Sequence, residues 1–234
     1  MKPEESVLKE IIDREWTMFH SVNEGAEKAS CQEDRRTFTG MRRAQFAAWS
    51  PQAAESYLRD LTIAAQEGRN LAAEKYIHMM RHTAPAEYAQ LKALLPPPDP
   101  AARRTADDIT EKLVAETALL RTQYPCVSEN GRPLRAQEDG PELTSIETYQ
   151  RGELYTYSAA TLELLQAHLT ARAQAGGSLA RDILENTMAY YGYPSLDAAE
   201  ADLSARRLEA YRQAAKERCC WTGGVIGTEE DGNG

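Results

Sequence analysis

Apolar residues recur at the spacing of an α-helix along most of the chain, and no other feature limits its possible folds as strongly. We find no convincing alternation of apolar and polar residues of the kind that predicts a β-strand. Alanine, leucine, glutamate and arginine are abundant, and these residues favour helices. The sequence therefore predicts an all-α fold of about eight or nine helices. The first, from about Glu4 to Val22, carries its apolar residues at Val7, Leu8, Ile11, Ile12, Met18, Phe19 and Val22.

Breaks in this periodicity define the expected organisation. We expect a single compact helical domain over residues 1–218. Residues 95–100 are expected to form a surface linker, because their prolines cannot continue a helix. Residues 124–143 are rich in Pro, Gly, Asn and Asp and predict an irregular loop, and a further helix is expected over residues 145–165. The Gly-rich, acidic residues 219–234 are expected to form a flexible tail.

Charge and composition argue against several classes of function. A net charge of −9 argues against the broad electrostatic affinity for nucleic acid or an anionic membrane that a basic surface provides, and it leaves a local basic patch open. No apolar run approaches the ~18 residues of a membrane span, and no apolar stretch follows a basic start as in a secretory signal. We therefore expect a cytoplasmic protein with reduced thiols and no nucleic-acid or membrane partner.

The sequence contains no motif for a cofactor. It has no Gly-rich phosphate loop, dinucleotide-binding fingerprint or lysine-centred cofactor motif, so we expect no cofactor. Glu74, His78 and His82 have a spacing that could hold a metal ion from one helix face. The apolar side of that helix lies elsewhere, which favours a solvated face, and we assign no metal site. The four cysteines lack zinc-site spacing: Cys31, Cys126, Cys219 and Cys220.

Three charged residues occupy positions that the helical spacing assigns to a buried face. Glu15 interrupts the apolar row of the first helix, and Arg42 lies among the aromatic residues of the second. Glu153 lies in one row with Tyr149 and Tyr157, within the stretch ETYQRGELYTYS. Charged groups at such positions must be paired, hydrated or protonated, because an unpaired buried charge is strongly unfavourable.

Two interpretations of these residues remain open. Glu147 and Arg151 form a neighbouring row in the same stretch, and Asn186 falls on the inward face of a later helix. The charged residues could form a structural ion-pair network between helices. Alternatively, they line a central polar pocket together with the tyrosines, where general acid–base chemistry would be possible.

Several blocks, in a fixed order, carry a family resemblance: REWTMFHSVNEGAEKASCQEDRRTFTGMRRAQFAAW, EKYIHMMRHTAPAEY, TSIETYQRGELYTYS and ENTMAYYGY. In these blocks the chain resembles a bacterial family catalogued as domain of unknown function 4125, over about residues 7 to 193. The name of the family implies no substrate. The family pattern and the helical rows select overlapping residues in two clusters far apart in the sequence, which supports a site formed between them. These residues are Glu15, Asn23, Cys31, Gln32, Arg42, Glu147, Arg151 and Glu153.

We hypothesise an enzyme that acts on a small polar, amino-acid-like metabolite by acid–base chemistry, of the lyase or hydrolase type. The candidate acid–base residues are Glu15, Glu153 and Tyr155. Arg42 and Arg151 are expected to hold a carboxylate, since a guanidinium matches its geometry. The full set of candidate ligand-binding residues is Asn23, Cys31, Gln32, Arg42, Glu147, Arg151, Tyr157 and Asn186.

Two other functions are kept as alternatives. One is a non-catalytic helical protein that uses the same pocket to bind a small molecule or a partner. The other is a metal-dependent enzyme that uses the carboxylates. We expect Glu15 and Arg42 to share one network, and Glu153 and Tyr157 to face the same cavity as Glu15. Arg151 is expected either at the rim of that cavity or paired with Glu147 one turn earlier.

Overall fold

The computed structural model describes residues 2–22, 33–129, 131–140 and 143–221, with side chains described up to residue 214. Within these ranges the chain is an all-α single domain without a β-strand. Ten α-helices are present in the described residues, and the two short 3₁₀ helices are η2 (Lys92–Leu94) and η3 (Ala136–Glu138). The α-helices are α1 (Glu5–His20), α2 (Arg35–Phe46), α3 (Pro51–Gln66), α4 (Leu71–Thr83), α5 (Pro85–Leu91), α6 (Pro100–Gln123), α7 (Ile146–Leu154), α8 (Ala159–Gln174), α9 (Leu179–Tyr190) and α10 (Leu196–Trp221).

The expected count of eight or nine helices was too low, and the segment expected as one helix over residues 145–165 shows why. This segment forms two helices, because α7 ends at Leu154 and α8 begins at Ala159. The hydroxyl of Ser158 accepts a hydrogen bond from the backbone N–H of Thr161 at 3.2 Å and so caps the start of α8. The aromatic periodicity continues across this break and hides it in the sequence.

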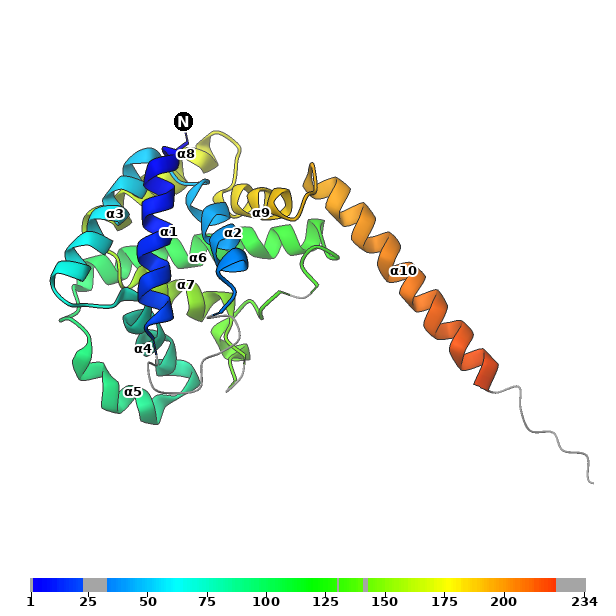
Figure 1. Ribbon diagram of the computed structural model, residues 1–234, viewed down its shortest axis with the longest axis horizontal. Helices are drawn as coiled ribbons and strands as arrows, with labels where there is room; N and C mark the ends of the chain where they lie inside the picture. Colours follow the sequence, from blue (N-terminus) through cyan, green and yellow to red (C-terminus); the bar gives the residue numbers. More distant parts are fainter. Residues whose placement is uncertain (1, 23–32, 130, 141–142, 222–234) are drawn as a thin grey trace, which may run out of the picture.

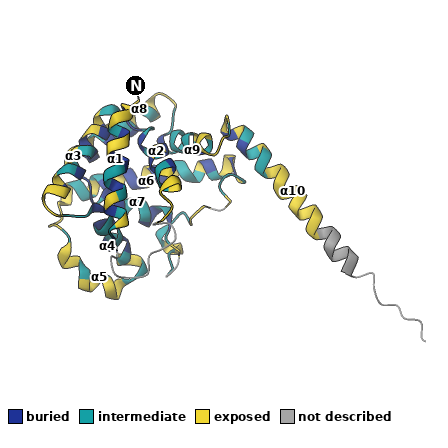
Figure 2. Ribbon diagram, in the orientation of Figure 1, coloured by how far each residue is buried: buried dark blue, intermediate teal, exposed yellow. Residues whose placement is uncertain are grey.

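The helices pack around a core that draws on most of the chain. Helix α1 packs against α2, α3 and α4, while α6 packs against α7, α8 and α9. Figure 1 shows α6 running across the molecule at a steep angle to α1. Side chains from five different helices are fully buried in this core, and Figure 2 shows the buried residues on the inward sides of the helices. They include Ile11, Phe46, Leu61, Ile109 and Leu165.

Two further segments lie at the edge of this packed body. The prolines of residues 96–98 are exposed. Helix α10 pairs with the body through Arg207 and Glu129 at 3.2 Å, and it packs on the body through its first turns, where Leu196 and Ala199 are buried. There Glu200 accepts hydrogen bonds from the backbone N–H groups of Cys126 and Val127, both at 2.9 Å. Beyond these turns α10 projects away from the other helices (Figure 1).

Helix α7 approaches α4 closely at Gly152. A Cβ atom at this position would lie 2.8 Å from Cγ of Met79 and 3.1 Å from the backbone oxygen of Lys75. Both distances are shorter than an ordinary carbon contact, so a side chain here would push the two helices apart. The absence of a side chain at Gly152 therefore fixes how near α7 lies to α4.

We expect Gly152→Ala to lower the free energy of unfolding by about 1–3 kcal/mol, the usual cost of overpacking, despite the higher helix propensity of alanine. Urea denaturation followed by circular dichroism measures this change. Gly140→Ala is the matched control, because a Cβ at Gly140 meets nothing within 4 Å. If the two variants are equally stable, α4 can move away from residue 152 without loss of stability, and the expectation is wrong.

Candidate functional site

Four charged side chains from four helices meet in the interior. They are Glu15 of α1, Arg42 of α2, Lys75 of α4 and Glu153 of α7, and each residue is between 6% and 9% exposed. The group contains two carboxylates and two cations, so its charges balance. This balance allows four charges to be buried together, since each charge has an opposite partner in place of water.

Arg42 is the centre of this cluster. Its Nε and Nη2 donate to the two carboxylate oxygens of Glu15 at 2.6 and 2.5 Å. Its Nη2 and Nη1 also donate to the two oxygens of Glu153 at 3.0 and 3.1 Å, and Nη1 donates to Oε1 of Gln45 at 2.9 Å. These five hydrogen bonds equal the five N–H groups of a guanidinium. Burial opposes the charge of Arg42, but the carboxylates of Glu15 and Glu153 outweigh it and raise its pKa well above the usual value.

Glu153 is held in its ionised form. Its Oε2 accepts a hydrogen bond from Nζ of Lys75 at 2.6 Å, and its Oε1 accepts one from Nε2 of Gln45 at 2.9 Å. Burial alone would raise the pKa of Glu153. The charges of Arg42 and Lys75, together with their hydrogen bonds, outweigh burial and hold this pKa well below its usual value of 4.5. A carboxylate with so low a pKa is a poor proton donor at neutral pH.

Two tyrosines donate hydrogen bonds to the carboxylates of the cluster. The hydroxyl of Tyr57 donates to Oε1 of Glu15, and that of Tyr157 donates to Oε1 of Glu153, both at 2.7 Å. The two rings are in contact, with centroids 4.5 Å apart. Burial, with the nearby carboxylates, raises the pKa of both hydroxyls well above the usual value. Both tyrosines therefore remain protonated and act as hydrogen-bond donors.

Lys75 is the residue of this cluster that the sequence analysis missed. Besides its bond to Glu153, its Nζ lies 3.4 Å from the centroid of the Tyr149 ring. The guanidinium of Arg132 also lies over that ring, at 5.0 Å, so Tyr149 contacts two cations. Burial opposes the charge of Lys75, but Glu153 outweighs it and raises the pKa of the ammonium group. Lys75 therefore stays charged.

A cavity of about 290 Å³ opens beside the cluster. Glu15, Arg42, Lys75 and Glu153 all line it, while Tyr157 does not. Most of its wall is apolar or aromatic. This wall includes Met18, Phe19, Phe38, Met41, Leu61, Leu71 and Tyr149.

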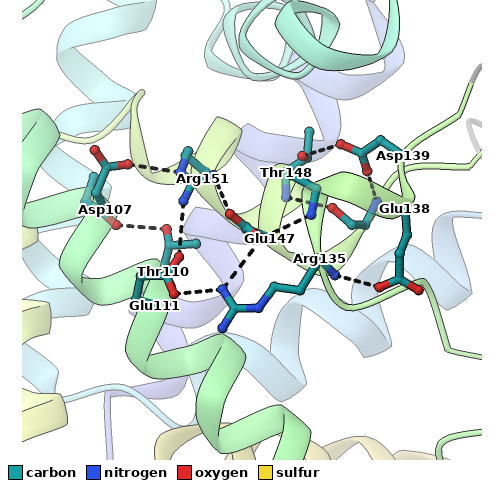
Figure 3. Close-up of polar contacts among 12 residues, drawn as sticks. Asp107, Thr110, Glu111, Arg135, Glu138, Asp139, Glu147, Thr148 and Arg151 are labelled. Carbon is teal, nitrogen blue, oxygen red and sulfur yellow. Dashed lines mark hydrogen bonds and ion pairs between the residues drawn. The ribbon is translucent and has the colours of Figure 1, made fainter.

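Arg151 and Glu147 lie in a second polar network on another face of α7 (Figure 3). Nη1 of Arg151 donates to Oε1 of Glu147 at 2.8 Å, and its Nε donates to Oδ1 of Asp107 on α6 at 3.0 Å. The other oxygen of Glu147 accepts from the backbone N–H of Ala136 at 3.0 Å. Arg151 thus takes the structural pairing with Glu147, and it does not line the cavity of Glu15.

Other predicted site residues lie apart from the cluster or outside the described residues. The hydroxyl of Tyr155 donates to Oδ1 of Asp107 at 2.7 Å, and burial together with this bond raises its pKa to about 12. Nδ2 of Asn186 donates to the backbone oxygen of Ala44 at 3.0 Å and joins α9 to α2. Neither residue lines the cavity of Glu15. Asn23, Cys31 and Gln32 lie outside the described residues.

A family model described as "Protein of unknown function (DUF4125)" matches residues 5–201. The chain belongs to this family. The match begins at the first residue of α1 and reaches into α10, so it includes all four helices that form the charged cluster. It confirms the resemblance inferred from the sequence blocks. No curated protein and no solved structure matches the chain.

None of the helices in the described residues combines the length and the apolar character needed to span a membrane. No three His, Cys, Asp or Glu side chains in the described part of the chain gather in a way that could hold a metal ion. Glu74, considered above with His78 and His82, instead pairs with Arg69 through two hydrogen bonds of 2.8 Å.

A signal for Lys75 is present in the sequence. Leu71, Lys75 and Met79 are spaced by four residues and form one row, and all three are buried. The reasoning that identified Glu15 in its apolar row therefore applies equally to Lys75. For Tyr57 no such signal exists, because a tyrosine in an apolar row is typical of an ordinary core.

We expect Glu153→Gln to lower the free energy of unfolding at pH 7 by about 3–5 kcal/mol, because it leaves the buried charges of Arg42 and Lys75 without a full partner. The pKa of Glu153 is lower in the folded state, so its contribution is present above pH 4.5 and is lost as the pH falls below that value. The difference between wild type and variant should therefore shrink on acidification. Urea denaturation between pH 7 and pH 3 measures it.

Glu10→Gln serves as the control for this pH series, since Glu10 is an exposed carboxylate on α1 that pairs with Arg14 one turn away. An exposed pair of this kind contributes about 0.3–0.5 kcal/mol. If Glu153→Gln behaves like Glu10→Gln at every pH, the buried cluster does not stabilise the fold as argued.

Proposed function

We propose that the cavity beside Glu15 and Lys75 is a central polar pocket that binds a small amino-acid-like molecule. The observation that carries this proposal is that two charged groups lining the cavity, those of Lys75 and Glu15, have unused hydrogen-bonding positions. Within the described residues, Nζ of Lys75 donates to one acceptor, whereas an ammonium group can donate three hydrogen bonds. Oε2 of Glu15 accepts one hydrogen bond there, from Nε of Arg42, and can accept another. A purely structural network would have little reason to leave both groups on a cavity wall.

The charge balance of the cluster favours a ligand without net charge. Two carboxylates already face two cations, so a ligand with a single charge would leave one buried charge without compensation. A zwitterion avoids this problem. Its ammonium group can donate to Glu15 and its carboxylate can accept from Lys75, which is the pattern of a free amino acid.

The wall of the cavity favours a ligand with an apolar side chain. Its lining is mostly apolar or aromatic, and its volume of about 290 Å³ is at the small end of ligand pockets. These features support an amino acid or a compound of similar size, with an aliphatic or aromatic body that lies against Phe38, Met41 and Tyr149.

Arg42 and Glu153 have a different role in this proposal from the one that the sequence suggested. All five N–H groups of Arg42 are used by protein acceptors, so it has no donor to offer a ligand carboxylate. Glu153 accepts five hydrogen bonds and has a low pKa. Both residues position Glu15 and Lys75, and these two contact the ligand.

One observation favours catalysis as a second candidate function. The carboxylate of Glu15 lines the cavity and keeps an acceptor position, so it could remove a proton from a bound molecule. Lys75 would stabilise negative charge that develops on a neighbouring oxygen. An enzyme of the lyase or hydrolase type would use this pair, whereas Tyr155 belongs to the network of Asp107 and has no part in it.

Ligand derivatives test the binding proposal directly. Leucine, methionine and phenylalanine are compared with their amides, which lack the carboxylate, and with their N-acetyl forms, which lack the ammonium group. We expect wild type to bind the free amino acids at least about tenfold more tightly than either derivative, because each lost charged hydrogen bond costs about 1.5–3 kcal/mol. Titration calorimetry gives the dissociation constants.

Two variants assign the contacts. Lys75→Met should remove the preference for the free amino acid over its amide, and Glu15→Gln should remove most of the preference over the N-acetyl form. Lys112→Met is the control, because Lys112 is an exposed lysine on α6. Circular dichroism verifies that each variant is folded. Binding of no amino acid, or equal loss in Lys112→Met, would contradict the proposal.

A metabolite screen separates binding from catalysis. Wild type and Glu15→Gln are each incubated with a cell extract, and the small molecules are compared by mass spectrometry before and after. A compound consumed by wild type and left intact by Glu15→Gln supports an enzyme. Binding without consumption of any compound supports a non-catalytic binding protein.

A further inference from the structure

A second group of cations lies on another side of α7, away from Glu15. A small cavity there is lined by His78 and Arg81 of α4, Tyr88 of α5, Arg103 of α6 and Tyr155 after α7. The rings of His78 and Tyr155 form a T-shaped contact with their centroids 5.3 Å apart, and the guanidinium of Arg103 lies over the Tyr155 ring at 5.0 Å. Two helices, α4 and α6, thus direct nitrogen-bearing side chains towards one place.

Two of the three arginines that line this cavity have no carboxylate partner in the described residues. Within the described residues, neither Arg81 nor Arg103 forms an ion pair, although the chain as a whole is acidic. Arg151 also lines the cavity but is already paired with Asp107, Glu111 and Glu147. Figure 3 shows its side chain directed towards Asp107. The carboxylate of Asp107 that lies close by is therefore already neutralised by Arg151.

His78 responds to this excess of positive charge. Burial, followed by the charges of Arg103 and Arg81, lowers the pKa of His78 to about 4. The imidazole is therefore neutral at neutral pH and keeps one N–H to donate. A neutral donor beside two cations without anionic partners is suited to an anion. The two cations would repel a positively charged ligand.

Three residues of the small cavity also line a larger cavity of about 250 Å³: His78, Arg103 and Tyr155. The prolines of residues 96–98, Leu154 and Leu162 add apolar surface to it. Its carboxylates are already in use within the fold. Asp60 accepts from the backbone N–H of Ser158, and Asp99 accepts from those of Ala101 and Ala102.

We propose that Arg81, Arg103 and His78 form a second ligand site that binds the phosphate group of a small phosphorylated molecule. The two guanidinium groups donate charge-assisted hydrogen bonds to the phosphate oxygens, and His78 donates a neutral one. The organic part of the molecule lies in the larger cavity, against the prolines. This site is separate from the cavity of Glu15 and does not depend on the function proposed for it.

Histidine NMR tests the site, because the chain contains only 4 histidines. His78 is titrated in chloride and in inorganic phosphate at equal ionic strength. We expect phosphate to raise the pKa of His78 by about 1 or more, since a bound anion favours the charged imidazole. The resonances of His168 on α8, whose Nε2 lies 2.9 Å from the backbone oxygen of Ala48, should not change. Identical titration of His78 in both salts would overturn the proposal.

Variants identify the residues that bind. Arg81→Gln and Arg103→Gln should each weaken phosphate binding about tenfold, the loss expected for one charged hydrogen bond. Arg104→Gln is the matched control, since Arg104 is exposed and lies about 100° further around α6. Because Arg81 is also exposed, its replacement should leave the fold intact. An equal loss in Arg104→Gln would show unspecific attraction and overturn the site.

The larger cavity is tested with phosphate esters. Phenyl phosphate and glycerol phosphate should bind more tightly than inorganic phosphate, because they bury additional surface. Leu162 is fully buried in the core, so the prolines are the better place for a substitution. Pro97→Asp should reduce the advantage of the esters without affecting inorganic phosphate. Equal affinity for esters and inorganic phosphate would contradict the role given to the larger cavity.

Discussion

The guanidinium group of Arg42 is the central hydrogen-bond donor of the buried charged cluster, on which the arrangement of the interior depends. It joins carboxylates from α1 and α7, which are far apart in the sequence, and all five of its N–H groups are used. A lysine could not replace it, because an ammonium group cannot face two carboxylates in bidentate fashion. With Arg42 in place, Glu15 and Glu153 can be buried side by side. Lys75 supplies the second positive charge and makes the cluster neutral.

Helix α7 separates two polar regions of different character. On one face Gly152 allows close packing on α4, so that Glu153 can reach Lys75. On another face Glu147 and Arg151 bind α6 and the segment before α7 (Figure 3). Neighbouring residues on a helix point in directions about 100° apart, so a short helix can serve both regions at once. The mixture of charges and tyrosines in ETYQRGELYTYS reflects these two separate environments.

The helical rows of the sequence were sufficient to select Glu15, Arg42 and Glu153, because a charge in an apolar row must be buried with a partner. They were not sufficient for Tyr155, which was expected near the same cavity and lies instead at Asp107, an ordinary helix residue that no pattern distinguishes. For Arg151 they left two positions open, the rim of the cavity and a pair with Glu147, and the structure has the pair. The helix break before Ser158 also could not be predicted, since the apolar spacing of the sequence continues across it. Lys75 was within reach of the same row argument and was overlooked.

The sequence by itself determined the all-α fold, the family and the burial of Glu15, Arg42 and Glu153. These properties depend on local spacing and on residue type, which a linear sequence contains. Only the tertiary structure decided which charges meet, because pairing depends on the distances and directions of helices that pack from distant parts of the chain. It also decided that all N–H groups of Arg42 are used, while in the described residues Lys75 keeps unused N–H donors and Glu15 keeps an unused acceptor position. The number of unused donor and acceptor positions on a side chain depends on all of its neighbours, and only the three-dimensional structure defines these neighbours.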